Sequence, residues 1–213
     1  MKLSKLVVFF VLLVAARDQA TSTPLGNVPR FIEVHSGLYR GGQPTIIGFE
    51  ELKKMGIRTV VNLRIDDSER RQVEALGMKY VHIPIDMPVL QRPWRQIPDK
   101  SVDNFLQTVN DPANQPVFVH CRRGADRTGT MIALYRVKID NWQATKAYDE
   151  AREIGLRWLY RGFRDQIFSL EELVKMSMTR QHDFISAVSS LCVRGRVAIS
   201  AVSDIEVWRA RCV

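Results

Sequence analysis

One cysteine and one arginine in this chain have the spacing that suits chemistry on a phosphate group. Cys121 follows an apolar run of β-branched and aromatic residues, 117–119, and Arg127 lies six positions further on, where apolar residues begin to recur at helical spacing. This pattern predicts a buried strand, a loop around Gly124 and then a helix. N–H groups at a helix N-terminus have no intrahelical partners and lie at the positive end of the helix dipole. Residues 117–130 therefore predict a binding loop for an anion such as phosphate.

The same loop holds a nucleophile and a clamp. Thiols at helix N-termini and beside cations ionise more readily than the free side chain, so Cys121 is expected to attack as a thiolate. The planar guanidinium of Arg127 can grip two phosphate oxygens. Thr128 is expected to donate its hydroxyl to the Cys121 sulfur, or else only to cap the helix. His120 is expected to fix the loop by hydrogen bonding. The alternative, a buried structural cysteine, needs neither the arginine nor an exposed loop.

The other loop residues are expected to contact the substrate. Backbone N–H groups from Arg122 to Arg127 would stabilise the phosphate oxygens. The side chains of Arg122 and Arg123 add positive charge there, or are simply exposed arginines. Asp126 is expected to point outward, toward loop N–H groups or Arg40, or to be a solvated charge. The predicted substrate-binding residues are Arg40, Arg122, Arg123, Gly124, Ala125 and Asp126.

The elements around the loop alternate between strands and helices. This order predicts an α/β fold with a central, mainly parallel sheet and helices on both faces. Ligands of such sheets bind at the carboxyl ends of the strands, so Arg40, Arg64 and Asp86 could lie at one edge with the Cys121 loop. Strands are expected near 37–43, 57–63, 78–85 and 117–120, and helices near 45–55, 67–76, 99–109, from 128, 143–155 and 161–176.

The length of 213 residues suits one globular domain with extra segments. Two early lysines precede an apolar run of eleven residues, 6–16, which is typical of a secretory signal peptide and shorter than the roughly 20 residues of a membrane span. We expect cleavage near Ala16 or Ala20 and an exported protein, periplasmic or secreted. The predicted organisation is a signal peptide at 1–20, a linker at 21–34, the catalytic domain at 35–178 and a tail of unclear structure at 179–213.

The composition limits which binding partners and cofactors are expected. A net charge of +8 favours anionic partners, but no nucleic-acid motif accompanies it, so no nucleic acid is expected. The four histidines show no metal-ligand spacing with the cysteines, and no metal or cofactor is predicted. Cys192 and Cys212 could form a disulfide that leaves Cys121 free, or both could remain thiols. The oligomeric state is not indicated.

Three motifs carry a resemblance to a known family. Residues 39–44, 60–64 and 120–129 resemble the cysteine-dependent protein tyrosine and dual-specificity phosphatases, whose signature is His-Cys, five residues, then Arg and Ser or Thr. The likeness covers about residues 30–175 and is strongest to compact bacterial-type dual-specificity enzymes, relatives of plant and fungal ones acting on inositol pyrophosphates. It implies metal-free hydrolysis of phosphate monoesters through a cysteinyl-phosphate. The substrate would be a phosphorylated protein or, alternatively, an inositol polyphosphate or phosphoinositide.

The resemblance also points to the general acid, which must protonate the leaving oxygen and later activate water. Asp86 lies 35 positions before Cys121, just past an expected strand, where this family carries its acid. Asp99 is the alternative, but as the first residue of an expected helix it would be favoured by the dipole without any catalytic role. The Trp-Pro-Asp triplet of the tyrosine-specific branch is absent.

Two other classes of protein remain open. A rhodanese-type sulfurtransferase also places a cysteine loop on a helix N-terminus, although its loop lacks the Arg-Thr-Gly ending of residues 127–129. A non-catalytic phosphate-binding module would keep Arg127 and lose the nucleophile or the acid.

Overall fold

The computed structural model of the chain describes residues 25–87 and 92–193. Within them lies one five-stranded sheet, in the order β1-β2-β5-β3-β4. The β1 strand pairs antiparallel with β2, and every other neighbouring pair is parallel. The elements are β1 Ile32–His35, β2 Leu38–Gly42, α1 Ile46–Lys54, β3 Thr59–Asn62, α2 Arg70–Ala75, β4 Lys79–His82, α3 Asp99–Asn110, β5 Val117–Cys121, α4 Asp126–Lys138, α5 Ala144–Ile154 and α6 Arg161–Val193.

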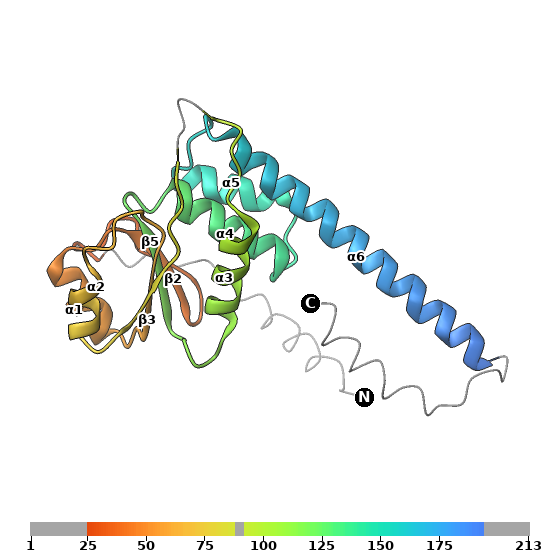
Figure 1. The fold of residues 1–213 in the computed structure, drawn as a ribbon, viewed down its shortest axis with the longest axis horizontal. Coiled ribbons are helices and arrows are strands. Elements are labelled where there is room, and N and C mark those ends of the chain that lie inside the picture. The colour runs from red at the N-terminus through yellow and green to blue at the C-terminus, as the bar shows by residue number, and fades with distance from the viewer. Residues whose placement is uncertain (1–24, 88–91, 194–213) are drawn as a thin grey trace, which may run out of the picture.

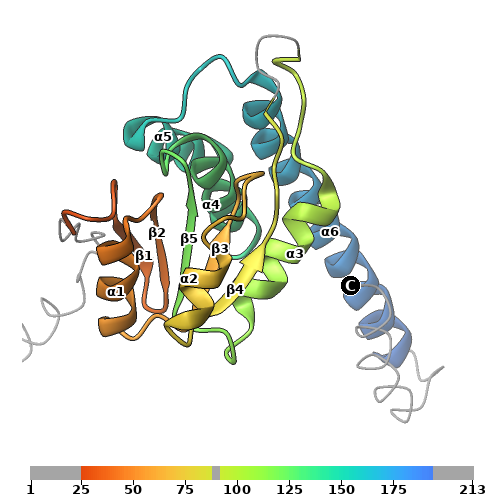
Figure 2. The ribbon, with the colours of Figure 1, turned by 60° about the vertical axis from the view of Figure 1, so that its left-hand side comes forward.

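Helices cover both faces of the sheet, as the alternating pattern predicted (Figure 2). Side chains alternate across a strand, so neighbouring residues of β5 enter different cores. Val119 and Cys121 pack in the core under α3, α4, α5 and α6, whereas Phe118 packs in the core under α1 and α2. The nucleophile therefore belongs to the face that α4 covers.

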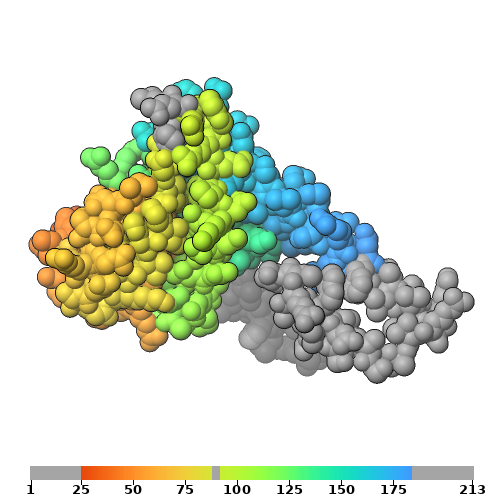
Figure 3. Space-filling model, viewed as in Figure 1, coloured from red at the N-terminus to blue at the C-terminus, as the bar shows by residue number. Residues whose placement is uncertain are grey.

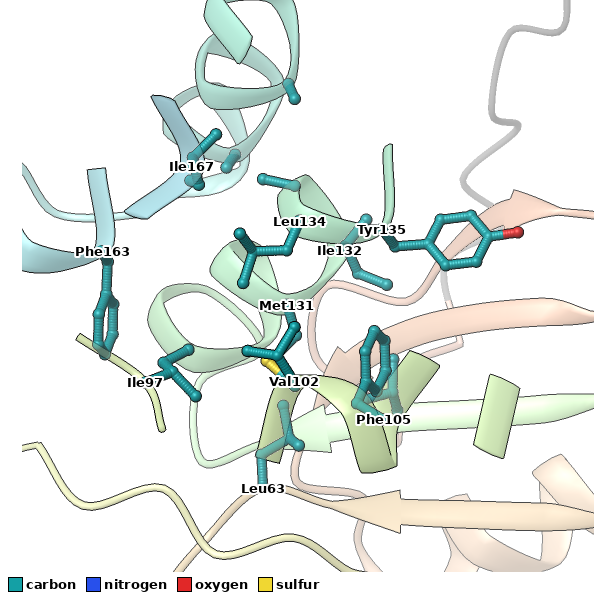
Figure 4. Packing of buried hydrophobic residues seen from close by; sticks show 14 of the residues in the cluster. Leu63, Ile97, Val102, Phe105, Met131, Ile132, Leu134, Tyr135, Phe163 and Ile167 are labelled. Atoms are coloured by element: carbon teal, nitrogen blue, oxygen red, sulfur yellow. The ribbon is translucent and has the colours of Figure 1, made fainter. Parts of the chain in front are cut away.

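The larger core fixes α4 against the sheet. Met131 and Ile132 of α4 are fully buried and lie near Leu63, which immediately follows β3, and Phe105 of α3 (Figure 4). Burying one such side chain contributes roughly 1.5–3 kcal/mol, so this packing holds the helix firmly. This packing also fixes the position of the N-terminus of α4, which faces the predicted anion-binding loop.

Local sequence signals account for α1. Thr45 is its N-cap, and the hydroxyl oxygen accepts a hydrogen bond from the N–H of Gly48 at 3.1 Å. The helix ends at Lys54, and Gly56 has a φ of +87°, a left-handed conformation that suits glycine. The expected helix at 45–55 is thus confirmed to within a residue at each end.

The expected linker at 21–34 is partly wrong, because its second half is structured. Val28 and Phe31 are buried in the core under α1 and α2, and β1 begins at Ile32. The strand is short, lies at the sheet edge and pairs only with β2, so its four residues carry little pattern of their own. The α2 helix also begins later than the expected residue 67, at Arg70 with Glu69 as its N-cap.

Helix α6 extends well beyond its predicted end near residue 176. It runs for 33 residues to Val193, through the first part of the segment expected to be a tail at 179–213, and stands away from the body of the molecule (Figures 1 and 3). The expected signal peptide and the pairing of Cys192 with Cys212 lie outside the side chains that the structure describes. Within the described ranges, none of the helices combines the length and apolar character needed to span a bilayer.

Candidate active site

Cys121 is the last residue of β5, and the chain loops directly from it into α4. The cysteine is 3% exposed, and the helix begins at Asp126 with Ala125 as its N-cap. The predicted strand, loop and helix are all present, although the helix starts two residues before the expected Thr128. The backbone of residues 122–127 therefore surrounds a helix N-terminus, where unpaired N–H groups favour an anion.

The loop lies directly against the end of β2. Gly124 has a φ of +71°, and a Cβ placed on it would lie 2.4 Å from the backbone of both Gly41 and Gly42. The N–H of Gln43 donates to the carbonyl oxygen of Arg122 at 3.3 Å. Only a residue without a side chain lets the loop approach the strand this closely, so the Gly41-Gly42 pair supports the loop.

Arg127 reaches from the first turn of α4 to the carboxyl ends of two strands. Its NH1 donates to the carbonyl oxygen of Leu63 at 3.2 Å, just past β3. Its Nε lies 2.7 Å from Sδ of Met87, in the segment after β4. The predicted clamp is thus held over the sheet edge, in contact with the segment that carries Asp86.

Asp86 lies next to Met87 on this edge. Its side chain is 59% exposed and pairs with Arg95, with 3.0 Å between Oδ2 and NH1. It borders a small hollow whose other walls include Tyr160 and Phe163. An exposed carboxyl at the rim can exchange protons with water and with a bound substrate. The alternative acid, Asp99, is the first residue of α3, as expected for a residue that the helix dipole favours.

Arg40 does not line the substrate side of the loop, which corrects its predicted role. It is 1% exposed, and its NH2 donates to the carbonyl oxygen of Gly124 at 2.8 Å. It lies on β2 opposite Val119, so strand alternation turns it toward α4 rather than outward. The rule that ligands gather at strand ends located the right edge but not the direction of this side chain.

Asp126 is buried rather than outward-pointing, and its partner is Arg157 instead of Arg40. Oδ1 accepts hydrogen bonds from the backbone N–H and Nε of Arg157 at 3.1 and 3.2 Å, and Oδ2 accepts one from NH2 at 3.1 Å. The side-chain hydrogen bond to Asp126 is the main cause that raises the pKa of Arg157. Arg123 lies 3.5 Å from Oδ2. The loop after α5 is thereby tied to the phosphate-binding loop.

His120 contacts another element rather than the loop itself. Its Nε2 lies 2.8 Å from Oε1 of Glu69, the N-cap residue of α2, and its ring stacks on Phe118. Glu69 also accepts a hydrogen bond from the side-chain amide of Gln43. The amide oxygen of Gln43 in turn accepts a hydrogen bond from Arg64 NH1 at 2.6 Å. Sequence reasoning missed Glu69, because an acidic residue before a helix is usually only a favourable first-turn charge.

The remaining predicted residues divide by exposure. Arg122 and Arg123 are exposed, whereas Gly124 and Ala125 are buried and offer only backbone atoms. Thr128 is buried, and its hydroxyl has no hydrogen-bond partner, so the expected bond to the Cys121 sulfur is not formed here. In the described part of the chain, no group of three or more His, Cys, Asp or Glu residues is placed to hold a metal ion.

Comparisons with known proteins match this chain to a family of phosphatases. A family model described as "DSP-PTPase phosphatase fused to NAD+ Kinase" matches residues 30–167. A probable tyrosine-protein phosphatase of Dictyostelium discoideum, DG1060, is 33% identical over 122 residues, which cover 56% of this chain and 72% of the relative. Inositol diphosphatase DSP2 of Oryza sativa subsp. japonica is 32% identical over 123 residues, and this match spans 56% of the chain and only 59% of the rice protein.

Solved structures show the same fold. The catalytic domain of the PP-IP phosphatase SIW14 from S. cerevisiae aligns with a TM-score of 0.56 at 23% identity, covering 70% of this chain and 93% of that one. TpbA of P. aeruginosa aligns with a TM-score of 0.57 at 20% identity, covering 74% and 98%. The predicted α/β fold is confirmed by both.

Proposed function

This chain belongs to the DSP-PTPase family of cysteine-dependent phosphatases, and from that premise we propose that it hydrolyses phosphate monoesters through a cysteinyl-phosphate intermediate. One observation carries the proposal. Cys121 and Arg127 stand at the two ends of a loop that closes on the N-terminus of α4. The loop thus brings together a nucleophile, a guanidinium that can bind two phosphate oxygens, and unpaired N–H groups.

In the first step, the Cys121 thiolate attacks phosphorus, forming a P–S bond as the ester P–O bond breaks. Arg127 and the loop N–H groups stabilise the charge on the three remaining phosphoryl oxygens. Asp86, protonated, gives its proton to the leaving oxygen. In the second step, Asp86 takes a proton from water, whose oxygen attacks phosphorus, and the P–S bond breaks to regenerate the thiolate and release phosphate.

Thr128 has the proposed role of assisting this second step. Its buried hydroxyl has no hydrogen-bond partner and lies in the first turn of α4, seven residues after Cys121, the last residue of β5. In this role, the hydroxyl would donate a hydrogen bond to the departing sulfur of Cys121. The cap role is the less favoured one, because the N-cap of α4 is Ala125.

Replacing Asp86 with asparagine is expected to lower kcat by about 10²- to 10⁴-fold for substrates with a poor leaving group, because the amide cannot protonate the leaving oxygen. Aryl phosphates with a good leaving group should lose much less. In Asp86→Asn, kcat should no longer fall as the pH is raised toward neutrality. Steady-state kinetics on an alkyl and an aryl phosphate across pH measure both effects.

The matched control is Asp99→Asn, which removes the same charge from the first turn of α3. It should leave kcat close to that of the unmodified enzyme. Full activity in Asp86→Asn with none in Asp99→Asn would transfer the acid role to Asp99.

For the substrate, we propose phosphotyrosine and other phosphoresidues of proteins, with inositol polyphosphates or phosphoinositides as the second candidate. The first is supported by the name of the Dictyostelium relative and the second by that of the rice relative. The exposed side chains of Arg122 and Arg123 would attract additional phosphates in the second case. Neither side chain has a role that requires a polyphosphate, so the protein substrate stands first.

A panel of substrates separates these candidates. Phosphate release should be measured for a phosphotyrosine peptide, a phosphoserine peptide, inositol polyphosphates and phosphoinositide vesicles at equal concentration. A kcat/KM highest for the phosphotyrosine peptide supports the first candidate, and one highest for an inositol polyphosphate supports the second. Thiosulfate-to-cyanide transfer without any phosphate release would favour the sulfurtransferase, and tight phosphate binding without turnover would favour the binding module.

We also propose that the enzyme is exported and acts in the periplasm or outside the cell. The support is the residue pattern of two lysines followed by the apolar run at 6–16. N-terminal sequencing of the exported protein should begin after Ala16 or Ala20. An intact Met1 on the soluble, mature protein would contradict export by this route.

A further inference from the structure

Arg40 is a charged side chain buried directly beneath the phosphate-binding loop. It lies on the α4-facing side of the sheet, as Cys121 does, and a Cβ on Gly129 of α4 would be 3.5 Å from its NH2. Its Nε and NH1 have no hydrogen-bond partner, and only NH2 is bound, to the carbonyl oxygen of Gly124. Burying a guanidinium with incomplete hydrogen bonding is costly, so Arg40 is expected to destabilise the folded protein.

The one bond that Arg40 makes controls the direction of a loop amide. In a trans peptide the C=O of one residue and the N–H of the next point in opposite directions. Arg40 draws the Gly124 carbonyl toward the sheet, so the N–H of Ala125 faces the opposite way. Ala125 is the N-cap of α4, so its N–H is one of the donors without an intrahelical partner that are available to a bound anion.

Arg40 also brings positive charge to the nucleophile. Burial lowers its pKa to about 10, while attraction to Glu150 on α5 and Cys121 on β5 raises it and repulsion from Arg136 on α4 lowers it. Arg40 therefore stays protonated at neutral pH. Charges interact strongly in a buried environment, so a fixed cation at this position favours a negative sulfur.

We propose that Arg40 is a positioning residue for the reaction: it orients the Gly124–Ala125 peptide for phosphate binding and stabilises the anionic form of Cys121 from beneath the loop. It does not touch the substrate, and it is distinct from Arg127, which lies in the first turn of α4. The role rests on the proposed phosphatase function. Two of its readouts, thiol alkylation and phosphate binding, do not require turnover.

The test compares Arg40→Met, which keeps the apolar stem and removes the charge, with Arg40→Lys, which keeps the charge and removes the fork. In Arg40→Met, kcat/KM on an aryl phosphate should fall about 10- to 100-fold. The pH at which iodoacetamide alkylates Cys121 at half its maximal rate should rise by about one unit. In Arg40→Lys the alkylation profile should stay near its original position, while protection of Cys121 by inorganic phosphate weakens.

The matched control is Arg136→Met. Arg136 is also a buried arginine on this face, but its partners are Asp140, Glu150 and the carbonyl oxygen of Val34, none of them in the loop. Its loss should lower the melting temperature and leave the alkylation profile unchanged. The proposal is overturned if Arg40→Met and Arg40→Lys both alkylate and bind phosphate like the unmodified protein, or if Arg136→Met shifts the alkylation profile as far as Arg40→Met does. An absence of turnover in the unmodified protein would instead refute the phosphatase function.

Discussion

Replacing Cys121 with serine should lower turnover on every phosphate ester by on the order of 10⁴-fold or more, while the protein still binds substrate. A serine hydroxyl fits the space of the thiol but is not ionised at neutral pH, so the attacking group is lost. Arg127 and the loop N–H groups remain in place to bind phosphate. Initial rates with an aryl phosphate measure the first effect, and calorimetric titration with a phosphotyrosine peptide measures the second.

Cys192→Ser is the matched control for this change. It makes the same substitution on α6, outside the phosphate-binding loop, and should retain full turnover. Labelled phosphate should be trapped on the unmodified enzyme after acid quenching and be absent from Cys121→Ser. A serine variant with even a tenth of the original rate would show that another group is the nucleophile.

The second large effect is expected at Arg127. Its replacement by alanine should weaken phosphate binding and lower kcat/KM together, by on the order of 10³-fold, because the same guanidinium holds the oxygens in the ground state and in the transition state. Arg127→Lys should recover only part of the loss, since an ammonium cannot form the bidentate pair. Inhibition by inorganic phosphate and steady-state kinetics measure the two quantities.

Arg58→Ala controls for the loss of a positive charge. Arg58 is exposed and immediately precedes β3, so it lies at the amino end of the parallel strands, opposite the loop. Its replacement should change kcat/KM by less than a factor of about three, because an exposed charge at that distance is screened. Equal losses in Arg58→Ala and Arg127→Ala would mean that overall charge, and not the clamp, drives binding.

The parts of the site that could be predicted are those encoded by neighbouring residues. Val119, Cys121, Gly124 and Arg127 lie within nine positions, so their spacing alone indicates a strand, a turn and a helix N-terminus. The same holds for α1, whose cap and terminating glycine are adjacent to it. Strand alternation with helices was enough to predict the sheet and its two covered faces.

The parts that were missed depend on pairing between distant segments. Asp126 meets Arg157 across 31 positions, and no local pattern marks either residue as the other's partner. Arg40 was placed at the correct sheet edge but not beneath the phosphate-binding loop, because that position depends on its contact with Gly124, 84 positions further along the chain. The edge strand β1 pairs with a single neighbour, so its residues carry too weak an alternation to separate it from a linker.

The support of the loop by β2 has a kinetic consequence. Arg40 and Gly124 are 84 positions apart, and the two glycines that receive the loop precede it by a similar distance. A peptide containing the signature alone would lack this support and could not hold its amides in place. Closing so large a chain loop costs entropy before any contact repays it. The return of activity during refolding should therefore never precede the pairing of β2 with β5. The rate at which activity returns thus sets a lower limit on the rate at which these two distant strands pair.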